Sequence, residues 1–225
     1  MRARPRLALG VIAIAVLMGG CAGPSIVSKS AKFPGMYSEK PLTILVLPPL
    51  NSTTAADAKA YYATTVTAPL AYTGYYVLPI AVTDDILKSQ GLYDTEMIGN
   101  QPLDRFGEYF GADAVLFTHI RKWDKSYIVI SSTLTVSVEA TLKSTKTNQI
   151  LWHYSGTIVT NLSGNNSGGG IAGLVAQAVI TAVNTAAADY VPYARVANVQ
   201  MLQSMPVGKY HARSGQDGED KVIDR

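Results

Sequence analysis

The stretch Ile128-Val-Ile-Ser-Ser-Thr-Leu-Thr-Val-Ser-Val-Glu-Ala-Thr-Leu142 decides the fold class of this chain. Its even-numbered positions are mostly apolar, and its odd-numbered positions are mostly Ser, Thr and Glu139. Alternation with a period of two predicts a long strand with one wet face. A polar turn at residues 145–148 follows, and apolar residues then recur on one face of a returning strand, at Ile150, Trp152, Tyr154 and Ile158. The stretch therefore predicts a long antiparallel β-hairpin.

Strand-like and helix-like segments alternate before the hairpin. Thr43 to Leu47 is a nearly continuous apolar run, as in a strand buried on both faces. Further strands are expected at residues 74–79 and 112–120, and helices at 55–67, at 102–110 and over a short stretch that Thr83 caps and Gly91 ends. This order predicts an α/β fold: a mixed sheet with helical crossovers and the long hairpin.

An Ala-rich helix is expected after the hairpin, from about Ile171 to Tyr190, and it has no Lys, Arg or Glu. It could simply pack on the sheet. Because no face carries charge, it could also meet another chain. The residues expected at such an interface are Ile171, Leu174, Ala176, Gln177, Val179, Val183 and Ala187.

A glycine-rich segment at residues 163–170 precedes that helix. Residues 168–173 match the G-x-G-x-x-G pattern of phosphate-binding loops. No further strand follows the helix, and no acidic residue is placed to hold a ribose, so a flexible loop is the favoured interpretation.

The first 21 residues have the order of a secretory signal. Three arginines within the first six residues precede an apolar run at residues 7–18, and two glycines then precede Cys21. This order resembles the lipobox of bacterial lipoproteins, although Met18 stands where Leu is usual and Leu17 lies one place earlier. The resemblance implies a lipid on the Cys21 thiol, cleavage before Cys21 and acylation of the new amine. The alternative is an ordinary signal peptide with an unrelated cysteine.

The predicted organisation has four parts. Residues 1–20 are a signal peptide, residues 21–40 a lipidated, extended tether, residues 41–204 a single α/β domain and residues 205–225 a disordered tail. Ala22 follows the cysteine, where an Asp would resemble an inner-membrane retention signal. Its absence favours the outer membrane, with the domain in the periplasm.

Charge and cysteine content exclude some classes of protein. The leader holds three of the 19 basic residues and none of the 16 acidic ones, so the mature chain has no formal net charge. The basic surface of a nucleic-acid binder is therefore not expected. Cys21 is the one cysteine, so the domain forms no internal disulfide.

Few residues are candidates for catalysis or metal binding. His119, His153 and His211 lie far apart without metal-ligand spacing, and we expect no metal and no cofactor. Asp84 and Asp85 suit a helix N-terminus better than a pair of catalytic acids. Asp113 could be functional or could mark a loop edge. No nucleophile elbow is present, so we expect a protein that is not an enzyme.

Four segments resemble a family of bacterial outer-membrane lipoproteins of unknown function, similar in fold to the N-terminal domain of TolB and to the curli-secretion lipoprotein. They are residues 44–53, 74–79, 111–116 and 146–152. The resemblance implies a non-catalytic binding or scaffold component of an envelope transport or secretion-associated complex. It implies other envelope proteins as partners, such as lipoproteins or a transporter, and a possible homo-oligomer. The alternative is a periplasmic activator of a cell-wall synthesis enzyme.

Overall fold

The computed structural model describes residues 25–128, 131–161 and 191–224 of the 225-residue chain. Among these residues, no helix has the length and apolar character needed to cross a membrane. The strands are β1 (Ser25–Ser28), β2 (Thr43–Val46), β3 (Leu50–Asn51), β4 (Tyr76–Leu78), β5 (Ala114–Ile128), β6 (Ser131–Ser144), β7 (Ile150–Asn161) and β8 (Lys221–Asp224). The helices are α1 (Lys29–Lys32), α2 (Pro34–Glu39), α3 (Ala58–Tyr72), α4 (Ile80–Ser89), α5 (Thr95–Gly99), α6 (Leu103–Phe110) and α8 (Val191–Leu202).

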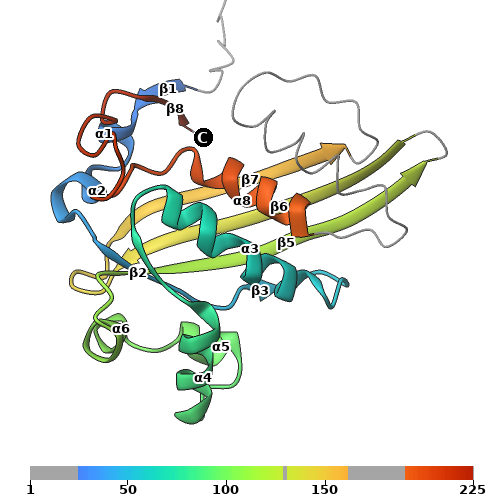
Figure 1. Ribbon diagram of the computed structural model, residues 1–225, viewed down its shortest axis with the longest axis horizontal. Helices are drawn as coiled ribbons and strands as arrows, with labels where there is room; N and C mark the ends of the chain where they lie inside the picture. Colours follow the sequence, from blue (N-terminus) through green and yellow to red (C-terminus); the bar gives the residue numbers. More distant parts are fainter. Residues whose placement is uncertain (1–24, 129–130, 162–190, 225) are drawn as a thin grey trace, which may run out of the picture.

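The main sheet is mixed, with the order β4-β2-β5-β6-β7 (Figure 1). Strand β2 runs parallel to both β4 and β5, and the short strand β3 extends the parallel pairing to β5. Strands β5, β6 and β7 pair antiparallel. The predicted α/β class and the long hairpin are therefore confirmed.

Helices cover the two faces of this sheet unequally. Ile44 and Val46 point to a large core under α3 and α8, whereas Leu45 and Leu47 point to a smaller core under α4, α5 and α6. These four side chains are essentially inaccessible to solvent, as the apolar run predicts. Only the parallel half of the sheet is thus buried on both faces. In the antiparallel half, apolar and polar residues alternate along the strands because one face is buried.

The long alternating stretch belongs to two strands. Strand β5 ends at Ile128 and β6 begins at Ser131, and these two residues pair. The prediction of a single strand over residues 128–142 is therefore wrong, because strand periodicity alone does not show a short connection between two strands. The predicted burial of the even-numbered face is confirmed from Val136 to Leu142. A register shift between Ile120 and Lys122 switches the inward parity of β5, so that Ile120 and Trp123 are both buried.

Several helix boundaries differ from the predictions. Helix α3 continues past the predicted end at residue 67 to Tyr72, with Pro69 buried in its last turn. Helix α4 begins at Ile80, so that Thr83 lies inside it instead of capping it. Helix α8 was not expected; its buried residues Ala194, Ala197 and Met201 pack it on the sheet beside α3. The predicted helix at residues 171–190 and the glycine-rich loop lie outside the described residues.

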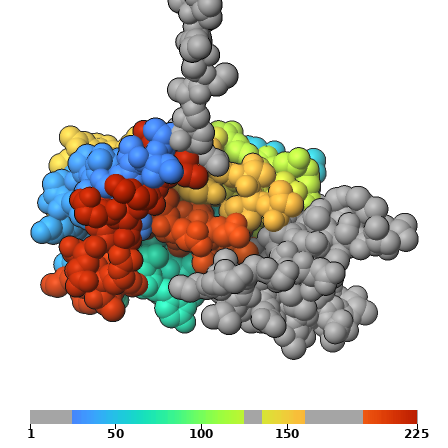
Figure 2. Space-filling view, turned by 90° about the horizontal axis from the view of Figure 1, so that it is seen from above, coloured from blue at the N-terminus to red at the C-terminus, as the bar shows by residue number. Residues whose placement is uncertain are grey.

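Both terminal segments depart from the predicted tether and tail. Residues 25–39 form β1, α1 and α2, and β8 pairs antiparallel with β1. The segments lie side by side on one surface of the molecule (Figure 2). Residues 205–220 pack against the turn after α3: the Tyr75 hydroxyl donates to the Pro206 carbonyl (2.6 Å) and the Gly208 amide to the Thr73 carbonyl (2.8 Å). Hydrogen bonds to the rest of the protein fix a segment that has few apolar residues of its own.

A buried ion pair fastens the two ends to each other. The Lys29 Nζ lies 3.7 Å from Asp217 Oδ2 and donates to the Met205 carbonyl (3.0 Å). The same carboxylate oxygen accepts the Val207 amide (2.8 Å). Lys29 is 7% exposed and Asp217 is 0% exposed, so both charges are largely shielded from water.

Replacing Lys29 should destabilise the protein far more than replacing an exposed lysine of the same surface. Lys29→Met leaves the Asp217 carboxylate buried without its cation, and about 3–5 kcal/mol should be lost. Lys221→Met should change the unfolding free energy by less than about 0.5 kcal/mol. Urea unfolding measures both. In a double-mutant cycle, Asp217→Asn should restore part of the Lys29→Met loss; simple additivity would contradict the pairing.

Candidate functional site

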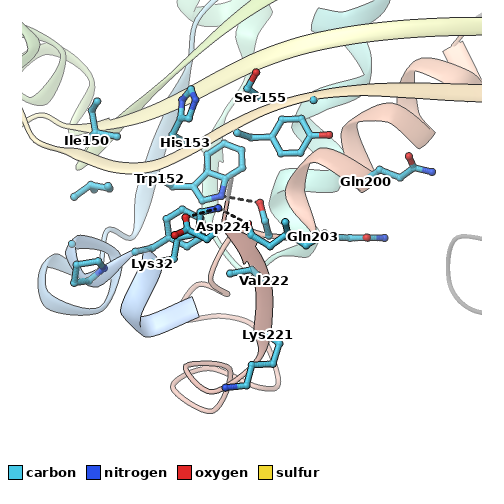
Figure 3. A pocket seen from close by; sticks show the side chains of 18 of the residues that line it. Lys32, Ile150, Trp152, His153, Ser155, Gln200, Gln203, Lys221, Val222 and Asp224 are labelled. Atoms are coloured by element: carbon cyan, nitrogen blue, oxygen red, sulfur yellow. Dashed lines mark hydrogen bonds and ion pairs between the residues drawn. The ribbon is translucent and has the colours of Figure 1, made fainter. Parts of the chain in front are cut away.

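A groove runs along the outer edge of the sheet. It has a volume of about 820 Å³ and lies between β7, the end of α8, the α1–α2 region and β8. This volume is within the range of about 300–1,000 Å³ that is usual for binding sites. Figure 3 shows that side chains from the two terminal segments and from β7 point into the same space.

The groove follows the backbone edge of β7. Every residue from Gln149 to Ile158 lines it. Neighbouring side chains of a strand point to opposite faces, so an unbroken run of lining residues means that the strand edge borders the groove. In the part of the chain that the structure describes, β7 pairs with β6 alone. Its other edge presents backbone donors and acceptors to whatever enters.

Aromatic residues form a fixed wall below this edge. Trp152 is fully buried and its indole N–H donates to Ser204 Oγ (3.2 Å), which ties β7 to the segment after α8 (Figure 3). The Tyr154 ring stacks on it, with centroids 6.3 Å apart and planes inclined by 15°. Gly35 allows α2 to approach β7 closely, since a Cβ there would lie 3.0 Å from the Leu151 side chain. The wall is therefore already formed without a ligand.

The rim of the groove carries both signs of charge. Lys32 Nζ donates to the Ile223 carbonyl (2.5 Å) and lies 3.5 Å from Asp224 Oδ1. Lys221 is exposed, and Gln200 and Gln203 add uncharged polar groups on the α8 side. A partly apolar wall, a strand edge and mixed rim charges suit an extended peptide segment, which uses backbone pairing for affinity.

A polar cluster lies on the face of the sheet opposite α3 and α8. Ser52 Oγ and His119 Nε2 share a hydrogen bond (2.6 Å), and His119 pairs across the strands with Glu139. Burial, together with the nearby Arg121 charge, lowers the pKa of His119. Arg121 donates to Glu139 (2.8 Å), and this hydrogen bond lowers the pKa of the Glu139 carboxyl. A catalytic Ser–His pair needs a third group that orients the histidine. Glu139 is the neighbouring acid, but its carboxylate is hydrogen-bonded to Arg121.

Asp113 has a structural position. Its Oδ2 accepts the amides of Leu42 (3.0 Å) and Thr43 (3.1 Å), and its Oδ1 accepts Lys146 Nζ (2.8 Å). Burial alone would raise the pKa of Asp113, but the hydrogen bonds from Lys146 and from the two backbone amides outweigh it and lower the pKa. Asp113 therefore joins the starts of β2 and β5 to the β6–β7 turn, which agrees with the loop-edge alternative.

The other predicted candidates do not converge. Asp84 forms an ion pair with Lys88 one turn along α4. His153 is exposed and bonds to Thr141 Oγ1, and His211 packs on Gly74. Within the described ranges no three potential ligands cluster as a metal site would require. Cys21 and the expected interface residues from Ile171 to Ala187 lie outside those ranges.

Sequence reasoning missed the groove. Trp152 and Tyr154 were visible as one face of a strand, but the opposite wall comes from segments interpreted as a tether and a tail. The signal that could have indicated the wall is the pair of short β-branched runs, Ile26-Val27 and Val222-Ile223, at the two ends of the folded part.

Asp113→Asn should destabilise the protein in a pH-dependent way. The lowered pKa means that the carboxylate stabilises the fold above the ordinary Asp pKa of about 4, and that this contribution is lost as the pH falls through the folded-state pKa. At pH 7 the loss should be about 1–3 kcal/mol. It should shrink in urea titrations carried out at successively lower pH. Asp124→Asn, at an exposed residue of β5, is the matched control, and an equal, pH-independent loss in both variants would contradict the assignment.

Comparisons with known proteins agree on one family. Residues 33–210 match the family described as "Putative lipoprotein GNA1162-like". The lipoprotein NMB1124/NMB1162 of Neisseria meningitidis serogroup B is 33% identical over 150 residues, covering 67% of this chain and 69% of the relative. The crystal structure of lipoprotein GNA1162 from Neisseria meningitidis is similar with a TM-score of 0.52 and 32% identity, over 64% of this chain and 98% of the other.

A more distant likeness is to the PelC dodecamer from Paraburkholderia phytofirmans, with a TM-score of 0.42 and 15% identity over 74% of this chain and 89% of the other. The descriptions of the family and of these proteins specify no reaction.

Proposed function

Because the chain belongs to the GNA1162-like family of lipoproteins, we propose that it is an outer-membrane lipoprotein that binds and holds partner proteins of an envelope transport or secretion-associated complex. The single observation that supports a binding role is the groove along the edge of β7 that pairs with no strand among the described residues. The protein performs this role without catalysis, with its domain in the periplasm.

The anchor in this proposal is a lipid on Cys21. Each buried CH₂ group contributes about 0.8 kcal/mol, and a single acyl chain holds a protein only marginally. Three acyl chains, as the lipobox resemblance implies, make attachment effectively permanent. Ala22 after the cysteine supports sorting to the outer membrane, since no Asp is present to retain the protein in the inner one.

The partner in this proposal is a protein segment that adds to β7. An edge strand supplies a row of backbone hydrogen-bonding groups that are satisfied when an extended segment pairs with them. The pre-formed wall of Trp152 and Tyr154 lowers the ordering cost of binding, because it is already packed and hydrogen-bonded. A role as activator of a cell-wall synthesis enzyme would use the same edge, and the identity of the captured partner separates the two roles.

Cys21→Ser should release the protein from membranes or leave it unprocessed. The serine hydroxyl cannot take the place of the thiol in lipid transfer, so the anchor is lost. Membrane fractionation and intact-mass measurement test this. Ala22→Asp is the companion variant: it should keep the lipid but move the protein to the inner-membrane fraction of a density gradient. A Cys21→Ser protein that is cleaved and still needs detergent for extraction would refute the anchor.

Ile150→Lys should reduce capture of envelope partners by the full-length protein. Ile150 is an exposed apolar residue at the start of the groove, and a lysine on an edge strand opposes the addition of another strand. Val82→Lys on α4 changes an equally exposed apolar residue on the other side of the sheet and should leave capture unchanged. Cross-linking in cells followed by purification measures the effect. Equal capture by both variants and the unaltered protein would remove the groove from the proposal.

The helix expected at residues 171–190 completes the proposal as a second contact surface, for self-association or for a partner. Single charges at Ala176, Gln177 and Ala187 should lower the molar mass measured by light scattering if copies associate through it. Circular dichroism checks that each variant remains folded. Folded variants with unchanged mass and unchanged partner capture would assign the helix to the core alone.

A further inference from the structure

The ribbon formed by β1 and β8 has two apolar faces. Ile26 pairs with Ile223 and Val27 pairs with Val222 across the antiparallel strands. Val222 is buried and Val27 packs against the main core, so this pair points inward. Because successive residues of a strand point to opposite sides, Ile26 and Ile223 form a cross-strand pair that points outward.

This outward pair is well exposed. Ile26 is 68% exposed and Ile223 is 48% exposed. Ser28 and Lys221 form the next pair on the same face, one step further from the chain termini. Single exposed apolar residues are common on protein surfaces. Two isoleucines side by side, with a lysine beside them, form the small amphipathic surface that suits a boundary between acyl chains and headgroups.

The covalent chain keeps this surface close to Cys21. Three residues, 22–24, separate Cys21 from Ser25, the first residue of β1. Even a fully extended chain places the Ser25 Cα no more than about 14 Å from the Cys21 Cα. The headgroup region on one side of a bilayer is about 5–8 Å thick. A lipid on Cys21 at the acyl-chain boundary therefore holds the start of β1 within about 6–9 Å of the outer limit of the headgroups.

We propose that the outward face of the β1–β8 ribbon rests on the lipid surface, with Ile26 and Ile223 at the acyl-chain boundary and Lys221 among the headgroups. This proposal rests on the lipid anchor of the proposed function. It adds an orientation: the face with β1 and β8 is turned to the membrane, and α4 and α6, on the far side of the main sheet in Figure 1, are turned away.

Ile26 distinguishes this occupant from a protein in the groove. Ile223 lines the groove as well as the ribbon face, so a groove ligand would also cover it. Ile26 is outside the groove lining, and a ligand that follows the β7 edge would leave it in water. A lipid surface covers both residues.

The test uses the full-length lipoprotein, purified and reconstituted at one chain per vesicle in a mixture of phosphatidylethanolamine and phosphatidylglycerol. Since lipid occupies the thiol of the single natural cysteine, an introduced cysteine takes a spin label alone. Labels are placed with Ile26→Cys, Ile223→Cys and, as an exposed control on α6, Tyr109→Cys. The readout is the ratio of collisions with lipid-soluble oxygen to collisions with a water-soluble nickel chelate.

The expected result is a higher oxygen-to-nickel ratio at positions 26 and 223 in vesicles than in Cys21→Ser chains lacking residues 1–20, free in solution, with no change at position 109. Equal ratios at positions 26 and 109 would overturn the proposal, and a rise at position 223 alone would assign the contact to the groove. A rise that disappears on dilution of chains in the vesicles would identify a second copy as the occupant. Measurement of the intact mass distinguishes failure of the anchor from failure of the orientation. A chain without lipid on Cys21 would overturn both. A lipidated chain whose ribbon does not contact the bilayer would overturn the orientation alone.

Discussion

The buried pair Lys29–Asp217 is the contact on which the edge of this molecule depends. It joins segments 188 positions apart in the chain, and both charges are shielded from water. Asp217 Oδ2 also accepts the Val207 amide, and Lys29 also donates to the Met205 carbonyl. Such a pair adds little to stability compared with an apolar packing, but it tolerates no alternative arrangement, since an unpaired buried charge is costly. Its contribution is to fix where the two chain ends lie.

The position of the ends decides what happens at the open side of the sheet. A mixed sheet must leave two edges, and an unprotected edge invites pairing with other chains. Here the terminal segments approach β7 through Gly35 and Ser204 without adding a strand to it in the described part of the chain. Within the described ranges the edge is therefore sheltered but unpaired. A groove of this kind limits access to segments that can lie along one strand, which is a form of selectivity that needs no specific side-chain chemistry.

How far the fold could be predicted depends on the kind of interaction. Apolar patterns were sufficient where burial decides the structure: the run at residues 43–47 and the alternation from Val136 to Leu142 have the predicted environments. Periodicity did not reveal the connection between β5 and β6. The predicted end of the helix at residue 67 was wrong because Pro69, in the last turn of α3, removes only one hydrogen bond, and its burial offsets that loss.

The polar segments were the least predictable. Residues 205–224 have a composition typical of disorder, yet Asp217 is wholly buried and Tyr75 holds the segment through the Pro206 carbonyl. Contacts of this kind depend on groups brought together by the finished fold, and nothing local in the sequence marks them. The groove could not be predicted for the same reason, because one of its walls is made of these segments. His119, His153 and His211 were easier to judge, since each contacts different neighbours in the structure.

The proposed anchor, the ribbon and the groove lie close to one another. Strand β8 is at once one strand of the ribbon and one wall of the groove, since Ile223 belongs to both. With the ribbon on the lipid surface, the groove opens within a few side-chain lengths of the headgroups. A partner segment must then approach along the membrane plane, and a membrane-bound partner searches two dimensions at a high effective concentration. If Cys21 carries the proposed lipid, its short connection to β1 would favour partners held in the same membrane over proteins that diffuse freely in the periplasm.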